Sequence, residues 1–218
     1  MSYLTDNFDE QIVSLLKGGG VGLLPSDTIY GLSCRALDEQ AVERICRLKG
    51  RDSDKPLIVL ISDIKMLDLL ASHQNPSGAV GNRIAKHQDF GARLSKEMKA
   101  ITGKYWPGPI SFILPMPGVA DWLQRGTRTL AIRLPDYPKL LQLINKVGPI
   151  ISTSANFQGD EPAVTVTEAR RAFDDKLDFY VDVGQLNNPP STLAIVKDGR
   201  LVVVRQGAVK LEEQGIYQ

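Results

Sequence analysis

Three basic residues lie close together in the chain, at the junction between a predicted helix and a predicted strand. Lys49, Arg51 and Lys55 share a seven-residue stretch. Gly50 favours the end of a helix and Pro56 disfavours helical backbone before it, so this stretch is predicted to be irregular. Arginine offers a planar fork of donors and lysine a point charge, which suits a phosphate or carboxylate ligand. The alternative is that Lys49 and Arg51 stabilise the helix C-terminus electrostatically and stay solvated.

Hydroxyl side chains follow three predicted strands, at the point where each strand ends or the next begins. They are Ser26 and Thr28, the run from Ser152 to Ser154, and Ser191 with Thr192. In open α/β sheets, ligands bind beyond the carboxyl ends of strands, so we expect these hydroxyls to share one crevice with the three basic residues. Serine and threonine also cap helices and turns, which is the alternative for any one segment.

Two arginines, Arg133 and Arg205, each follow an apolar run that predicts a strand. A guanidinium at a strand end beside a crevice can hold a carboxylate or phosphate; the alternative is a surface ion pair. The sequence has no P-loop, GxGxxG or HExxH motif. Its two histidines, His73 and His87, fall in a polar stretch that does not suit a catalytic triad. The pattern therefore favours positioning and charge stabilisation, as in nucleotidyl transfer.

Helical and strand-like patterns alternate along the first part of the chain, and a hairpin pattern follows late. This predicts a single-domain α/β fold with an open, twisted, mixed sheet flanked by helices over residues 1–218, with a core at 8–209 and a surface excursion at 72–90. The hydroxyl-rich loop 25–32 is expected to lead into a helix, and residues 198–199 to form the hairpin turn. Helices are predicted at 7–16, 38–48, 64–70, 92–102, 138–147 and 168–173. Strands are predicted at 21–24, 57–61, 110–114, 130–133, 149–152, 179–183, 193–196 and 201–204.

The composition is ordinary for a soluble globular protein, with 43% hydrophobic and 23% charged residues and a net charge of +1. Any affinity for nucleotides or nucleic acid must therefore come from local clustering of charge. Cys34 and Cys46 are predicted to be small buried residues. Two cysteines do not indicate a disulfide framework or a zinc site, so a cytoplasmic protein is expected. The sequence predicts no membrane span and no signal peptide.

Six motifs, in order along the chain, resemble those of a known family. They are PSDTIYGL (25–32), KGRDSDKPLIVL (49–60), WPGPISFIL (106–114), TLAIRLPDYP (129–138), STSANFQGDEP (152–162), and PPSTLAI (189–195) with VVVRQGAV (202–209). On these motifs the chain is identified as a member of the YrdC-like family, the threonylcarbamoyl-AMP synthases. Ser26 and Ser111 stand where that family has threonine, and Asp52 stands where it commonly has proline.

The resemblance implies a sheet curved round a basic cavity and a specific reaction. L-Threonine, bicarbonate and ATP would give threonylcarbamoyl-adenylate and pyrophosphate, with Mg²⁺ accompanying the pyrophosphate. The product would pass to threonylcarbamoyl-transferase machinery that modifies the adenosine beside the tRNA anticodon. Because the chain ends at Gln218, the further C-terminal domain of longer family members is expected to be absent.

The resemblance also implies roles for individual residues and assigns none to a metal. The catalytic positions, around the nucleotide phosphates, are Lys49, Arg51, Ser154 and Asn156. The positions that contact ATP are Arg51, Lys55, Thr129, Ser154, Pro162 and Arg205. The positions that line the threonine pocket are Thr28, Leu60 (through its backbone), Arg133, Ser152 and Ser191.

Two other functions remain open for this sequence. One is a YrdC-like paralogue without synthase activity, whose basic cluster from Arg44 to Lys55 binds tRNA or double-stranded RNA by phosphate contacts. The other is a free-standing carbamoyl-transfer module like those of hydrogenase maturation proteins. The sequence lacks the acylphosphatase and zinc-finger segments of those proteins, which counts against this alternative. The intact threonine-pocket positions favour the synthase.

Overall fold

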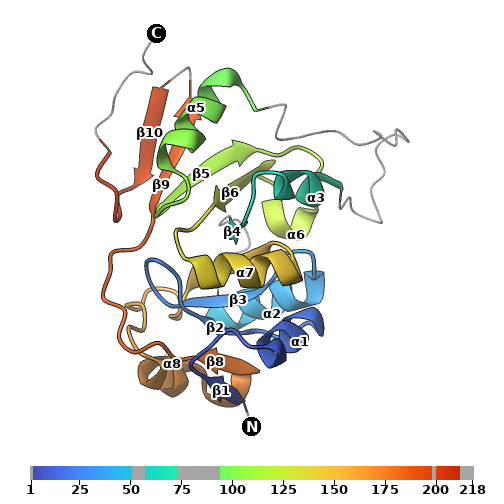
Figure 1. The fold of residues 1–218 in the computed structure, drawn as a ribbon, viewed down its shortest axis with the longest axis vertical. Coiled ribbons are helices and arrows are strands. Elements are labelled where there is room, and N and C mark those ends of the chain that lie inside the picture. The colour runs from blue at the N-terminus through green and yellow to red at the C-terminus, as the bar shows by residue number, and fades with distance from the viewer. Residues whose placement is uncertain (1, 51–56, 73–93, 198–199, 212–218) are drawn as a thin grey trace.

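The computed structural model of the chain describes residues 2–50, 57–72, 94–197 and 200–211. The strands in these ranges form one mixed, ten-stranded sheet with helices on both faces, which confirms the predicted α/β class (Figure 1). The strand order is β1-β8-β2-β3-β7-β4-β6-β5-β9-β10. The predicted hairpin turn at 198–199, most of the 72–90 excursion and both histidines lie outside the described residues.

The helices and strands have the following bounds. The strands are β1 (Tyr3–Thr5), β2 (Gly22–Leu24), β3 (Gly31–Arg35), β4 (Ile58–Leu60), β5 (Ile110–Pro115), β6 (Thr129–Arg133), β7 (Ile150–Ser154), β8 (Phe179–Val181), β9 (Thr192–Lys197) and β10 (Arg200–Arg205). The helices are α1 (Glu10–Lys17), α2 (Glu39–Lys49), α3 (Met66–Ser72), α5 (Lys96–Tyr105), α6 (Asp121–Gln124), α7 (Pro138–Val147) and α8 (Val166–Phe173), followed by the 3₁₀ turn η1 (Asp174–Lys176).

Helix α2 begins and ends where its capping residues predict. The Asp38 carboxylate accepts the backbone N–H of Ala41 at 3.0 Å, which satisfies one of the free donors at the helix start. Gly50 adopts a left-handed conformation (φ 58°) that ends the helix. Lys49 is therefore the last helical residue, and its side chain is directed by the helix rather than by an irregular segment.

The predicted start of α1 and the predicted end of α5 are wrong, each for a local reason. Helix α1 begins after Asp9, whose carboxylate accepts the N–H of Ile12 at 3.0 Å, and not after Asn7. Helix α5 continues through Gly103 to Tyr105. It ends before Trp106, because Pro107 disfavours helical backbone at the preceding residue.

The loop that carries the first hydroxyls connects two antiparallel strands, so the predicted helix after it is wrong. Leu24 of β2 pairs with Gly31 of β3. Strand β3 is buried at its first four positions because it pairs with β2 on one side and β7 on the other. Strand β1 and helix α6 were not predicted, since three and four residues are too few for a recognisable period.

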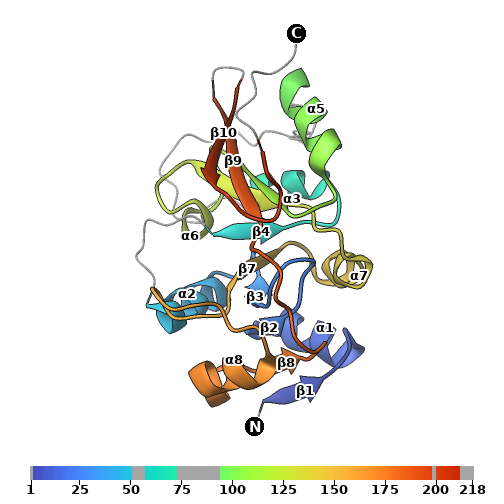
Figure 2. The same cartoon turned by 90° about the vertical axis from the view of Figure 1, so that its left-hand side faces the viewer.

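Helices cover the two faces of the sheet in separate apolar clusters. Helices α1 and α7 pack on one face, where Leu16 and Ile144 join Ile150 of β7. Helices α2 and α8 pack in the other cluster, where Ile45 and Phe173 are fully buried. Figure 2 shows these two pairs of helices on opposite sides of the sheet. The central strands are thus held from both faces.

Both cysteines are buried, as predicted. Burial raises the pKa of Cys34 well above its usual range, so this thiol stays protonated. Across the described ranges, every helix is too short or too polar to cross a membrane.

Replacing Gly22 by alanine should destabilise the fold, because an added Cβ would lie 2.4 Å from ring carbons of Phe179, its partner on β8. We expect the free energy of unfolding to fall by about 1–3 kcal/mol in urea titrations. Gly103→Ala is the control: a Cβ there meets nothing within 4 Å, so helix α5 should gain roughly 0.5–1 kcal/mol. A Gly22→Ala protein with the original midpoint would contradict the packing of β2 against β8.

Candidate functional site

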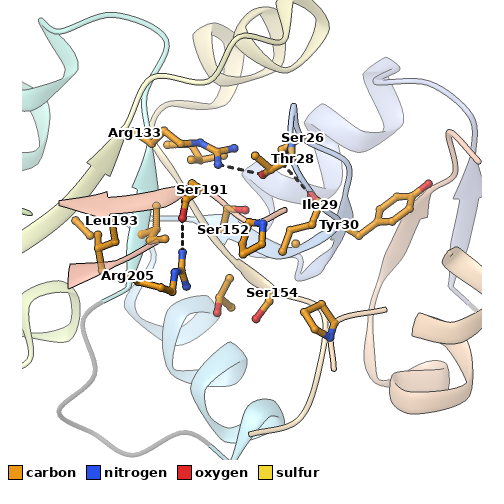
Figure 3. Close-up of a pocket in the computed structure, with 17 residues that line it drawn as sticks. Ser26, Thr28, Ile29, Tyr30, Arg133, Ser152, Ser154, Ser191, Leu193 and Arg205 are labelled. Carbon is orange, nitrogen blue, oxygen red and sulfur yellow. Dashed lines mark hydrogen bonds between the residues drawn. The ribbon is translucent and has the colours of Figure 1, made fainter. Parts of the chain in front are cut away.

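A cavity of about 220 Å³ opens over the middle of the sheet (Figure 3). Its walls come from the β2–β3 loop, from strands β3, β4, β6, β7 and β9, and from the end of β10. Hydroxyls from distant parts of the chain therefore meet there, as the strand-end pattern predicts. The lining residues are Ser26, Thr28, Ile29, Tyr30, Gly31, Ile58, Leu60, Ala131, Arg133, Ser152, Thr153, Ser154, Pro162, Pro190, Ser191, Leu193 and Arg205.

Strand periodicity explains why most of the side chains from the central strands point into the cavity. Alternate residues of a strand lie on the same face of the sheet. On this principle β4, β6 and β7 each present two residues to the cavity, namely Ile58 and Leu60, Ala131 and Arg133, and Ser152 and Ser154. On the other face of the sheet, Val59, Ile132 and Ile151 are buried in the apolar core. Val59 lies between Ile58 and Leu60, Ile132 lies between Ala131 and Arg133, and Ile151 precedes Ser152.

Arg133, the last residue of β6, is almost completely buried at one end of the cavity. Its Nη2 lies 2.7 Å from Oδ1 of Asp27, and its Nη1 donates to the Thr28 hydroxyl at 3.1 Å. The other oxygen of Asp27 accepts the backbone N–H of Asp136 at 3.1 Å. Asp27 therefore ties the β2–β3 loop to the segment that follows β6.

The guanidinium of Arg133 retains capacity for a ligand. Burial lowers its pKa, and the Asp27 carboxylate opposes that shift, so the group remains a cation. Its Nε–H is buried and has no hydrogen-bond partner among the described residues. An unsatisfied buried donor on a cation is costly, and an anionic ligand would satisfy it.

A second arginine reaches the cavity from the end of β10. Arg205 donates from Nη2 to the carbonyl oxygen of Ser191 at 2.8 Å (Figure 3). Partial burial lowers the pKa of Arg205, although part of the residue stays exposed. The Ser191 hydroxyl lies 3.0 Å from the Ser111 hydroxyl. Ser111, which stands where the family has threonine, therefore still makes a hydrogen bond to a residue that lines the cavity.

Lys49 meets the turn that follows β7. Its ammonium lies 2.6 Å from the carbonyl oxygen of Ser154, and 2.8 and 2.9 Å from the carbonyl and side-chain oxygens of Asn156. The Ser154 hydroxyl donates to the same side-chain oxygen of Asn156 at 2.7 Å. Lys49 is only 5% exposed, so the solvated alternative for this residue is wrong.

The structure brings most of the predicted site residues to the cavity. Thr129 begins β6 on the same face as Ala131 and Arg133, next to the lining residues. Arg51 and Lys55 lie outside the described residues. The predicted residues that line the cavity are Thr28, Leu60, Arg133, Ser152, Ser154, Pro162, Ser191 and Arg205.

Thr192 does not join the crevice, which corrects the prediction for this residue. Its hydroxyl donates to the carbonyl of Val209 at 2.6 Å and accepts the backbone N–H groups of Gly207 and Val209. It therefore fastens the segment after β10 to the start of β9. This is the structural role that serine and threonine often have at turns.

Two contributors to the site were missed because their partners are far away in sequence. Asp27 was given no role, although a carboxylate among the loop hydroxyls was a signal for a nearby cation. Tyr30 is fully buried, donates to the carbonyl of Gly184 at 2.7 Å and accepts the N–H of Val183 at 2.9 Å. It thereby joins the β2–β3 loop to the segment between β8 and β9.

Comparison with known proteins supports one family. The Sua5/YciO/YrdC family model, described as "Telomere recombination", matches residues 14–207. A threonylcarbamoyl-AMP synthase of Hahella chejuensis is 34% identical over 176 residues, covering 80% of this chain and 85% of that protein.

Solved structures of two relatives have the same fold. Pyrococcus abyssi Sua5 complexed with L-threonine matches 95% of this chain with a TM-score of 0.77 and 26% identity. The chain spans only 57% of that protein. Escherichia coli YciO matches 96% of this chain and 98% of its own length, with a TM-score of 0.72 and 26% identity.

Asp27→Asn should be strongly destabilising, because it leaves the buried Arg133 cation without its counter-charge. We expect the free energy of unfolding to fall by about 3–5 kcal/mol, measured by urea denaturation. Glu10→Gln is the matched control, since Glu10 pairs with Lys146 on the surface, where the two side chains are 79% and 51% exposed. That change should cost at most about 1 kcal/mol. If the free energy of unfolding fell equally in both variants, the Asp27–Arg133 pair would contribute no more than a surface ion pair.

Tyr30 should make stability fall at alkaline pH. Burial raises the pKa of Tyr30 from 10.0 to about 12, so folding favours the neutral phenol. Its contribution is complete below pH 10 and is lost as the pH rises through about 12. Urea midpoints measured across this range should fall less steeply in Tyr30→Phe than in the parent. An unchanged slope would show that Tyr30 titrates normally.

Proposed function

This chain belongs to the Sua5/YciO/YrdC family, and we propose that it is a threonylcarbamoyl-AMP synthase. It forms threonylcarbamoyl-adenylate and pyrophosphate from L-threonine, bicarbonate and ATP, for threonylcarbamoyl modification of tRNA. The observation on which this proposal rests is the convergence of Arg133, Arg205 and hydroxyls from three segments on one cavity. The names of its relatives, one of which was solved with L-threonine, support the same activity.

The amino acid binds at the Arg133 end of the cavity. The threonine carboxylate accepts from the guanidinium, whose buried Nε–H otherwise lacks a partner among the described residues. Thr28 and Ser191 supply hydroxyls to the polar groups of the substrate. Leu60, which is 1% exposed, contributes backbone and apolar surface to this end. The threonine pocket is thus formed by Thr28, Leu60, Arg133, Ser152 and Ser191.

The nucleotide binds at the end of the cavity formed by the turn after β7 and the end of β10. Ser154, Pro162 and Arg205 line the cavity there, and Thr129 lies beside them on β6. Arg51 and Lys55 are assigned to the same end of the cavity on the basis of the sequence motif alone. The catalytic set proposed around the phosphates is Lys49, Arg51, Ser154 and Asn156.

The reaction is a nucleotidyl transfer that needs no protein nucleophile. The lone pair of the threonine amine forms a bond to the carbon of CO₂, supplied by bicarbonate, and the amine proton leaves to solvent. An oxygen of the resulting carbamate attacks the α-phosphorus of ATP, and the bond from that phosphorus to pyrophosphate breaks. Fixed cations offset the negative charge that develops, which is the main contribution the protein makes.

Mg²⁺ enters with the phosphates of ATP. Among the residues that the structure describes, no group of three or more His, Cys, Asp or Glu side chains is placed to hold a metal ion. The ion would keep several water ligands and be held through the substrate phosphates, as is common for this metal. We place the enzyme in the cytoplasm because the sequence has only two cysteines, both of which are buried thiols.

The alternative of duplex RNA binding has less support from the described cations. Arg44 lies 2.5 Å from Asp178 and donates to the carbonyl of Lys176 at 2.6 Å, while Lys49 is buried. Two members of the basic cluster are therefore engaged within the fold. Direct binding of tRNA and delivery of the adenylate to a transferase remain proposals that follow from the reaction.

Arg133→Lys should impair use of threonine selectively, because lysine lacks the planar fork that binds a carboxylate. In assays of pyrophosphate release with bicarbonate present, we expect the KM for threonine to rise by about tenfold or more. The KM for ATP should change little. Arg171→Lys, an exposed arginine on α8, is the control and should behave as the parent.

The same assay tests the function itself. The parent should release pyrophosphate only when threonine is added. Release that is independent of threonine, or none at all, would overturn the proposal. Salt-sensitive retardation of duplex RNA in that case would favour the RNA-binding alternative.

A further inference from the structure

Lys49 is a buried cation whose hydrogen bonds are directed into the protein. Its ammonium has three oxygen acceptors within 2.9 Å, as many as it has N–H groups. A buried ammonium is tolerated when such partners replace water. To bind a phosphate directly, Lys49 would have to release at least one of these oxygens.

The side chain of Asn156 is also used within the fold. Its oxygen accepts from Lys49 and from the Ser154 hydroxyl, and its nitrogen donates to the carbonyl of Asp160 at 2.6 Å. The backbone N–H of Gln158 returns to the carbonyl of Lys49 at 3.1 Å. Contacts in both directions therefore join the end of α2 to the turn at residues 154–160.

This turn forms one wall of the cavity. Ser154 at its start and Pro162 just beyond its end both line the cavity, whereas Lys49 and Asn156 are not among the lining residues. The backbone N–H of Ala163 donates to the carbonyl of Ala155 at 2.9 Å, which closes the segment on itself. A shift of the turn would therefore move the wall that Ser154 and Pro162 form.

We infer that Lys49 and Asn156 are positioning residues that hold the 154–160 turn, and that Ser154 is the member of this trio that meets the nucleotide. The inference rests on the proposed function for the identity of the ligand. It changes the role of Lys49 from a phosphate ligand to a clamp between α2 and the turn. The two side chains then act as one unit, so that losing either has the same consequence.

A double-mutant cycle tests this unit. The variants are Lys49→Met, Asn156→Ala and their combination, and the measurement is the Kd of a non-hydrolysable ATP analogue by titration calorimetry with Mg²⁺. We expect each single change to weaken binding about tenfold and the double change to weaken it by no more than either. A product of the two effects, about a hundredfold, would mean independent roles and overturn the inference. Lys146→Met, at a 51% exposed lysine, is the control and should bind as the parent.

Salt dependence separates a clamp from a phosphate ligand. An exposed contact with phosphate is screened by salt, so losing it would make analogue binding less salt-sensitive. We expect Lys49→Met to keep the salt dependence of the parent. A clearly shallower dependence would assign Lys49 to the phosphates.

Backbone hydrogen exchange gives a test that needs no ligand. In Asn156→Ala, exchange within residues 154–160 should accelerate, while exchange in α7 stays unchanged. This variant can be examined even if Lys49→Met fails to fold. Unaltered exchange in the turn would contradict the clamp. If the parent protein does not bind the analogue, the proposed function fails, and the clamp is judged on exchange alone.

Discussion

A buried positive charge in the middle of the sheet requires the rest of the site to be arranged around it. Arg133 is held by Asp27, and the two residues are 106 positions apart in the chain. Taking a guanidinium out of water is costly unless a counter-charge and hydrogen bonds replace the solvent. The same requirement recurs at Lys49, where carbonyl and amide oxygens replace water. The cations that suit an anionic ligand are thus also the groups that join distant segments.

The mixed sheet makes this convergence possible. Strand β7 pairs with β3 on one side and β4 on the other, and β4 continues in parallel to β6. The loop before β3 therefore lies over the ends of strands that come much later in the chain. Helices α1 and α7 pack on one face of the sheet and α2 and α8 on the other. Most of the cavity wall thus comes from strands of a packed sheet, which suits catalysis by positioning.

The charges that can attract a ligand lie at the cavity and are not reflected in the net charge of the protein. The net charge of +1 gives no strong field around the molecule. At the cavity, the buried Arg133 and the partly exposed Arg205 meet a set of hydroxyls, and both oxygens of Asp27, the carboxylate partner of Arg133, are engaged within the fold. An anion with several polar groups matches this lining. Threonylcarbamoyl-adenylate, the product of the proposed reaction, is such a ligand.

The sequence by itself determined the features that depend on neighbouring residues. The caps of α2 at Asp38 and Gly50, the start of α7 at Pro138 and the family motifs are all local patterns, and most strands were located by their apolar runs. Tertiary structure alone decided the pairing of Asp27 with Arg133, the burial of Lys49 and the separate use of Thr192. The first two depend on partners more than a hundred residues away in the chain, which no local pattern encodes. The use of Thr192 depends on where the chain returns after β10. Short elements such as β1 likewise exist because a neighbouring strand satisfies their backbone groups.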